Sequence, residues 1–76
     1  MGNEEYIKLR KLLVDARKES GLTQADLAVR LKRPQSFVSK YERGERRLDL
    51  VEFRDVANAL GVDPVRFLRR FYSEET

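Results

Sequence analysis

The chain has 76 residues, of which sixteen are Lys or Arg and thirteen are Asp or Glu, so its formal net charge is +3 and its pI is about 9.5. It contains no cysteine, histidine or tryptophan. A chain of this length is one domain, 1–76, which buries only about 60% of its unfolded surface. Without cysteine there is no disulfide framework or thiolate zinc site, and without histidine the commonest general base is missing. We therefore expect a domain held by apolar packing, with no metal and no cofactor, and an anionic partner.

We find no segment with the sequence pattern of a membrane span or of an export signal. The longest unbroken apolar stretch, Leu12-Leu13-Val14, is far shorter than the roughly 20 residues that span a bilayer. The N-terminus places acids before bases and has no long apolar run, which is unlike a signal peptide. We expect a cytoplasmic protein with no membrane association.

Glycines, caps and prolines divide the chain into five helices. Gly21, Gly44 and Gly61 each follow an apolar-periodic stretch, where a glycine commonly ends a helix. Helix starts are indicated by N-cap residues and prolines, namely Thr23, Pro34, Asp49 and Asp63-Pro64. The predicted helices are 4–20, 23–31, 34–43, 49–60 and 63–72.

The apolar residues of these segments recur at helical spacing, and no stretch alternates apolar and polar residues as a strand does. The fold class is therefore all-α, with short connections between helices. The acidic end of the chain, 73–76, is expected to be a flexible tail.

The positive charge is concentrated in one part of the chain. Residues 30–47 contain seven bases and two acids, a surplus of +5, whereas the other fifty-eight residues hold nine bases and eleven acids. Such a cluster can be an ordinary solvated surface. It is also the pattern of a phosphate-binding surface, because release of counterions drives binding to nucleic acid.

The faces of helix 34–43 favour the second interpretation. At about 100° per residue, Val38, Tyr41 and Glu42 share one face, and Ser36, Lys40 and Arg43 share the opposite one. A short helix with an apolar back and a polar front is suited to insertion into a groove of DNA. Two interpretations stay open for Phe37, which borders the core and could also contact a thymine methyl group.

Three motifs occur in order: GLTQADLA at 21–28, VSKYERG at 38–44 and ANALGV at 57–62. Together they make the chain, from about 17 to 68, resemble the lambda-repressor-like helix-turn-helix family, also called Cro-type or xenobiotic-response-element regulators. The resemblance implies a compact five-helix bundle with a helix-turn-helix at 23–43. It implies a sequence-specific transcriptional regulator that binds double-stranded DNA, with recognition helix 34–43 in the major groove. A homodimer on a palindromic operator is expected.

The resemblance also assigns roles to individual residues. The expected base contacts are Gln35, Ser36, Ser39 and Lys40. The expected phosphate contacts are Gln24, Lys32, Arg33, Arg43, Arg46 and Arg47. Arg17 and Glu42 fall at positions that often form a structural ion pair in the family. Among these, glutamine can bond adenine in a bidentate way and lysine suits guanine, whereas phosphate contacts position the protein without reading sequence.

The sequence departs from the family pattern in the turn before the recognition helix. Lys32 stands where the family most often has glycine, at a site that tends toward left-handed φ. A lysine there costs roughly 1 kcal/mol, and it can add a phosphate contact. Pro34 replaces the usual Ser or Thr cap, so one side-chain acceptor is missing.

The last helix carries more apolar surface than a single stripe needs. Phe67, Phe71 and Tyr72 are the expected dimer contacts, with Phe67 exposed, and the alternative is that these rings cap the core of the monomer. An antitoxin-like or other protein-interaction module, with DNA binding secondary, is the rival functional class.

An enzyme is not expected. Ser36 and Lys40 lie four residues apart, as in a Ser–Lys nucleophile pair, but nothing in the sequence indicates an oxyanion site. The four glycines also form no phosphate-binding loop.

Overall fold

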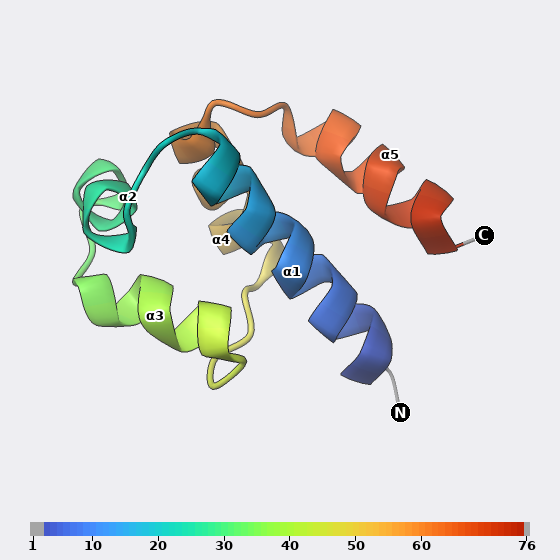
Figure 1. The fold of residues 1–76 in the computed structure, drawn as a ribbon, viewed down its shortest axis with the longest axis horizontal. Coiled ribbons are helices and arrows are strands. Elements are labelled where there is room, and N and C mark those ends of the chain that lie inside the picture. Colours follow the sequence, from blue (N-terminus) through green and yellow to red (C-terminus); the bar gives the residue numbers. More distant parts are fainter. Residues whose placement is uncertain (1–2, 76) are drawn as a thin grey trace.

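The computed structural model describes residues 3–75, which form five helices and contain no strand. The helices are α1 (Asn3–Glu19), α2 (Gln24–Leu31), α3 (Gln35–Arg43), α4 (Leu50–Leu60) and α5 (Pro64–Glu75) (Figure 1). The predicted all-α class is confirmed, and the first four helices begin and end within one residue of the predicted bounds.

The predicted end of the last helix is wrong. Helix α5 continues to Glu75, because Ser73 and the acids after it include no glycine or proline that would stop it. The Ser73 hydroxyl donates back to the Arg69 carbonyl at 2.8 Å, inside the helix. The segment expected to be a flexible tail is thus helical as far as Glu75, and Thr76 lies outside the described residues.

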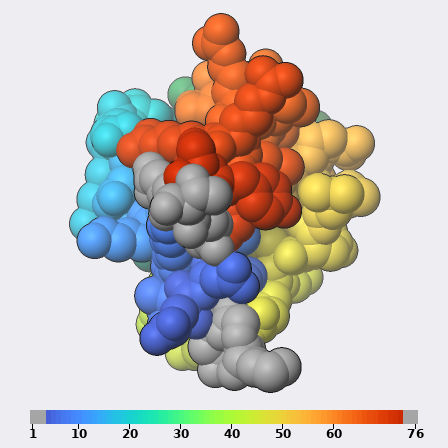
Figure 2. Space-filling model, turned by 90° about the vertical axis from the view of Figure 1, so that its right-hand side faces the viewer, coloured from blue at the N-terminus to red at the C-terminus, as the bar shows by residue number. Residues whose placement is uncertain are grey.

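Helix α1 crosses the middle of the molecule, with α3 and α5 on opposite sides of it (Figure 1). Helix α2 packs on both α3 and α4, and α4 packs on α5. Seen from the right-hand side of that view, the first turns of α1 and the end of α5 occupy one face (Figure 2). Helix α3 is therefore carried at an edge of the molecule, away from α5.

Three predicted N-caps bond the first amides of their helices, and two of them, Thr23 and Asp49, form reciprocal capping boxes. The Thr23 hydroxyl accepts from the Asp26 amide at 3.0 Å, and the Asp26 carboxylate accepts from the Thr23 amide at 3.0 Å. Asp49 and Glu52 exchange the same two bonds at 2.7 and 3.0 Å. Asp63 accepts from the first amides of α5. These bonds satisfy amide groups that a helix start would otherwise leave unpaired.

The turn between α2 and α3 contains the left-handed residue expected from the sequence. Lys32 ends α2 with φ 57° and ψ 43°. Within residues 3–75 it is the one residue other than glycine that has a positive φ. Pro34 is the N-cap of α3 and supplies no side-chain hydrogen bond, so the helix begins at Gln35, one residue later than predicted. The direction of α3 is thus set by a strained lysine and a proline.

All five helices contribute to one apolar core. Its buried members are Leu12, Leu13, Leu27, Ala28, Phe37, Val38, Tyr41, Phe53, Val56, Ala57, Leu60 and Phe67. Phe37 is 7% exposed, so its ring belongs to the core. A Phe37 ring in the core favours the packing interpretation over contact with a thymine methyl.

The prediction that Phe67 is exposed is wrong. Its side chain is 8% exposed, and its ring centroid lies 5.5 Å from that of Phe53 in α4. Helix α5 is rotated so that Phe67 faces α4, which leaves Phe71 half-buried and Tyr72 exposed. The aromatic rings of α5 therefore divide between the monomer core and the surface.

Candidate nucleic-acid interface

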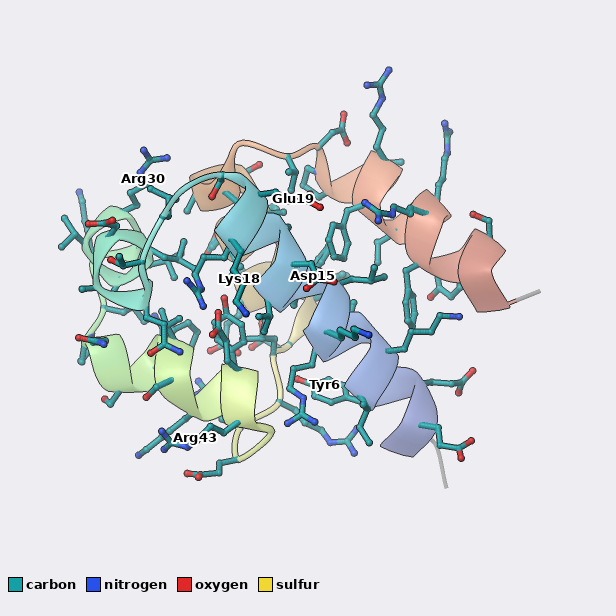
Figure 3. All side chains as sticks on the ribbon, in the orientation of Figure 1. Tyr6, Asp15, Lys18, Glu19, Arg30 and Arg43 are labelled. Carbon is teal, nitrogen blue, oxygen red and sulfur yellow. The ribbon has the colours of Figure 1, made fainter. Side chains whose placement is uncertain are left out.

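Helix α3 has a buried back and a polar front. Its exposed side chains are Gln35, Ser36, Lys40 and Arg43, and its buried ones are Phe37, Val38 and Tyr41. Ser39 is half-buried, and its hydroxyl donates to the Ser36 carbonyl at 3.3 Å. Arg43 projects from the side of α3 that faces away from α1 (Figure 3). The helix thus offers one amide, two hydroxyls and an ammonium group along a single face and its flank.

An ion pair fixes the inner side of α3. Arg17 Nε donates to Glu42 Oε2 at 2.7 Å, and Arg17 Nη2 donates to Glu42 Oε1 at 3.1 Å. Arg17 also donates to the Leu22 carbonyl at 2.9 Å. The hydrogen bond to Glu42 raises the pKa of Arg17, in spite of the desolvation that opposes it. The pair joins the end of α3 to α1 and to the turn that follows α1.

Gln24 belongs to the same network. Its side-chain amide donates to Glu42 Oε1 at 2.8 Å, and the residue is half-buried at the start of α2. A phosphate contact by Gln24 would therefore use the second N–H of its amide, because the first already bonds Glu42.

The charged side chains at the end of α3 and in the segment after it lie in different environments. Arg43 pairs with Glu45 at 2.8 Å on the open surface, and this hydrogen bond lowers the pKa of Glu45. Arg47 lies with its guanidinium 4.5 Å from the centroid of the Tyr6 ring, whose hydroxyl accepts from the Leu48 amide at 3.0 Å. Figure 3 shows Tyr6 between α1 and this segment. The N-terminal half of α1 thus holds the segment that follows α3.

Arg10 of α1 contacts the same segment one turn further along. Its guanidinium lies against Gly44, where a Cβ atom would collide with it. Gly44 also has φ 83° and ends α3. The left-handed backbone is the reason that position 44 favours glycine, because the Arg10 guanidinium is the end of a flexible side chain and can move away from an added Cβ.

The remaining expected phosphate contacts lie at the two ends of α3. Lys32 is exposed in the turn before it. Arg33, in the same turn, and Arg46, in the segment after α3, both lie over the Phe37 ring and contact Glu52 of α4. The fold thus gathers six of the seven basic residues of 30–47 along α3 and at its two ends, whereas Arg30 of α2 points away from α3 and donates to the Ala59 carbonyl of α4 at 3.0 Å (Figure 3).

Three residues of this surface escaped the sequence analysis. No site role was predicted for Tyr6 or Glu52. Arg10 has no local signal, because its contact with Gly44 depends on how α1 packs against α3. The spacing of Tyr6 and Arg10, four residues apart on one side of a helix, is the one clue that the sequence offers.

The described chain has neither a metal centre nor a membrane helix. No group of three or more acidic, histidine or cysteine side chains within residues 3–75 could hold a metal ion. No helix in that range is long and apolar enough to cross a bilayer.

With this geometry in place, comparison with known proteins identifies the family. The sequence profile of the helix-turn-helix family matches residues 13–67, and the chain belongs to this family, in its XRE branch. The family is one of DNA-binding regulators of transcription, which are not enzymes. The resemblance inferred from the three sequence motifs is thus confirmed.

Solved structures resemble the chain over nearly its whole length. An XRE-family-like protein from Pseudomonas syringae pv. tomato is 47% identical, with a TM-score of 0.94, over 97% of this chain and 90% of that one. The restriction-modification controller C.AhdI from Aeromonas hydrophila is 31% identical, with a TM-score of 0.76, over 84% and 97%.

A third similar structure contains DNA. The controller C.Esp1396I, as a tetramer in complex with its natural 35 base-pair operator, is 27% identical, with a TM-score of 0.82, over 92% of each chain. None of the curated protein sequences compared with the chain matches it.

Proposed function

We propose that this protein is a sequence-specific regulator of transcription that inserts α3 into the major groove of double-stranded DNA. The observation that carries the proposal is the composition of α3, which buries three large side chains and exposes Gln35, Ser36 and Lys40. Arginines lie at both ends of the helix, where a groove-bound helix meets the phosphate backbone.

The roles of the exposed side chains follow from their chemistry. Gln35 can donate to and accept from adenine, and Lys40 can donate to the two major-groove acceptors of guanine. Ser36 and Ser39 have hydroxyls that bond either kind of base edge. Arg43 and Arg47, with Lys32, supply positive charge for phosphates and so contribute affinity that is independent of sequence.

The test is to select preferred duplexes from a random pool and to measure affinity for the selected and a scrambled duplex across a range of salt. The wild type should prefer the selected duplex and bind both more weakly as salt rises. Lys40→Ala should lower affinity for the selected duplex by about tenfold or more, with little effect on the scrambled one. Arg47→Ala should weaken binding to both alike and reduce the salt slope by about one.

Two results would contradict the proposal. One is that no duplex binds even at low salt. The other is that the protein binds every duplex equally, in which case α3 does not read sequence.

We also propose that the protein acts as a homodimer, which would set two recognition helices about 34 Å apart on a palindromic site. The surface that supports this lies between α4 and α5. Leu50, Val51 and Val65 are 73%, 56% and 59% exposed, and they surround an apolar hollow with Phe53 and Leu68. The similar controller that binds its operator as a tetramer supports an assembly of more than one chain.

This surface differs from the dimer contact expected from the sequence. Of the expected residues, Phe67 lies in the monomer core, whereas Tyr72 is exposed beside the half-buried Phe71. A second copy on the α4–α5 surface would cover aliphatic side chains that water otherwise contacts, which is the main driving force of association.

Sedimentation over a wide range of protein concentration tests the dimer. The wild type should dimerise, and Val65→Glu should stay monomeric because it places a charge in the contact. Val29→Glu is the matched control, because Val29 is 77% exposed on α2 and should not affect association. A wild type that stays monomeric at every concentration, or a Val65→Glu variant that dimerises as well as Val29→Glu, would overturn the proposal.

A further inference from the structure

The two arginines at the ends of α3 share one aromatic ring. The guanidinium carbon of Arg33 lies 4.4 Å from the centroid of the Phe37 ring, and that of Arg46 lies 5.0 Å from it. Arg33 precedes α3 and Arg46 follows it, so the ring brings together charges from both ends of the helix. A cation over a ring face is attracted by the quadrupole of the ring.

Glu52 is the second residue that holds them. Arg46 Nη2 donates to Glu52 Oε2 at 2.6 Å, and Arg33 Nη2 lies 3.6 Å from the same oxygen. Two guanidinium groups this near one another repel, and a carboxylate between them offsets the repulsion. Phe37 and Glu52 thus keep two like charges at one place.

The three charged side chains are buried to different extents. The side chain of Glu52 is 11% exposed, whereas those of Arg33 and Arg46 are 43% and 39% exposed. The carboxylate therefore lies on the inside and the guanidinium groups on the outside. Each guanidinium has five N–H donors. Arg46 uses some of its donors on Glu52 and one on the Arg47 carbonyl, at 3.3 Å, and N–H groups of both arginines remain for a ligand.

We propose that Arg33 and Arg46 form one prearranged site for a phosphate of the DNA backbone, in which Glu52 is the positioning residue. This inference rests on the proposed function. Long side chains lose conformational freedom when they bind, and a carboxylate that already holds them removes part of that cost. Glu52 therefore strengthens binding to DNA although its own charge repels phosphate.

A role of Glu52 in charge neutralisation alone predicts the opposite change in affinity for DNA. If Glu52 only neutralised the two arginines, its removal would free them and tighten binding to every duplex. Glu52→Gln separates the two roles, because it removes the charge while a glutamine can still accept from the Asp49 amide and complete the capping box.

Asp55→Asn is the matched control. Asp55 lies one turn further along α4 and lines the same small hollow beside Arg33 and Phe37, and it forms an ion pair with Arg54 at 3.3 Å. The Asp55→Asn substitution changes the net charge by the same amount as Glu52→Gln, but it keeps the contacts of Glu52 with Arg33 and Arg46.

The experiment measures the affinity of each variant for the duplex selected by the wild type and for a scrambled duplex, across a range of salt. Glu52→Gln should bind both duplexes about tenfold more weakly than the wild type and with a shallower salt slope. Asp55→Asn should bind as tightly as the wild type or slightly more tightly. In a protein that also carries Arg33→Ala and Arg46→Ala, Glu52→Gln should cause no further loss.

Thermal unfolding of each variant accompanies these measurements, since a merely structural role would lower the melting temperature and leave the salt slope of the folded protein unchanged. The inference is overturned if the wild type binds DNA and Glu52→Gln binds as tightly or more tightly. It is also overturned if the loss persists without the two arginines. A wild type that binds no duplex would instead remove the proposed function, and this inference with it.

Discussion

Arg17 in α1 and Glu42 in α3 are 25 residues apart in the chain and are joined by two hydrogen bonds, at 2.7 and 3.1 Å. Their side chains are 12% and 6% exposed, so the pair lies in a largely dry setting. Gln24 donates to the same carboxylate, which brings a third helix to the contact. Helix α3 is thus oriented by a polar network on its inner side.

Removal of Arg17 should destabilise the protein strongly. Arg17→Ala leaves the mostly buried Glu42 carboxylate with the hydrogen bond from Gln24 but without its ion pair, and breaking such a pair costs about 3 kcal/mol in the free energy of unfolding. Urea denaturation measures this loss. Glu45→Gln, which breaks the exposed pair with Arg43, should change stability very little. Equal losses in the two variants would contradict the structural role of Arg17.

Replacement of Lys32 by glycine should stabilise the protein. Relief of the left-handed strain exceeds the added entropy of the unfolded chain, so Lys32→Gly should gain about 0.5 kcal/mol. Lys32→Ala removes the same charge and keeps the strain, so it should gain nothing. Thermal unfolding distinguishes the two, and the strain argument fails if both variants melt at the same temperature.

Tyr6 should protect the segment that follows α3. Tyr6→Phe removes the acceptor of the Leu48 amide and should cost about 1 kcal/mol of stability, because that amide loses its hydrogen bond. Tyr6→Leu should cost more, because it also removes the ring under Arg47.

Hydrogen exchange provides the specific measurement for Tyr6. The Leu48 amide should exchange faster in Tyr6→Phe than in the wild type, while Tyr72→Phe, on an exposed ring, should leave it unchanged. An unaltered Leu48 exchange rate in Tyr6→Phe would show that this bond contributes nothing in solution.

The capping box of α2 should make stability depend on pH in the acid range. Hydrogen bonds from the Thr23 backbone, and then from its side chain, lower the pKa of Asp26 from its ordinary 3.8. A carboxyl whose pKa is lower in the folded state stabilises above its unfolded pKa, and this contribution disappears as the pH falls through the folded value.

Asp26→Asn removes that titration. The wild type should be the more stable of the two at neutral pH, and the difference should shrink below about pH 4. Denaturation curves collected from neutral pH down to about pH 2 check this. A difference that stays constant over the whole range would show that the charge of Asp26 does not stabilise the cap.

The parts of the fold that could be predicted are those with local causes. Thr23 and Asp49 bond amides three residues away, and Gly44 ends the helix that contains it, so short motifs were sufficient. The polar front of α3 likewise follows from spacing within nine residues.

The parts that could not be predicted depend on packing between distant segments. Helix α5 has apolar side chains around more than one face, and only the position of α4 determines that Phe67 is buried and Tyr72 exposed. Glu52 has one local role, in the capping box, and a second that appears only when the two arginines lie beside it.

Helix α1 and the segment from Glu42 to Leu48 contact each other in antiparallel order. Arg17 meets Glu42, Arg10 meets Gly44, and Tyr6 meets Leu48. Tyr6 and Arg17 are eleven residues apart, which is about three full turns and keeps both on one side of the helix.

Helix α1 is thus a rigid spacer of fixed length as well as part of the core. One residue inserted between Tyr6 and Arg17 would rotate one of the two by about 100° and move it about 1.5 Å along the axis. Either contact could then form only at the expense of the other. The protein should therefore tolerate many substitutions on the outer side of this stretch, but no change in its length.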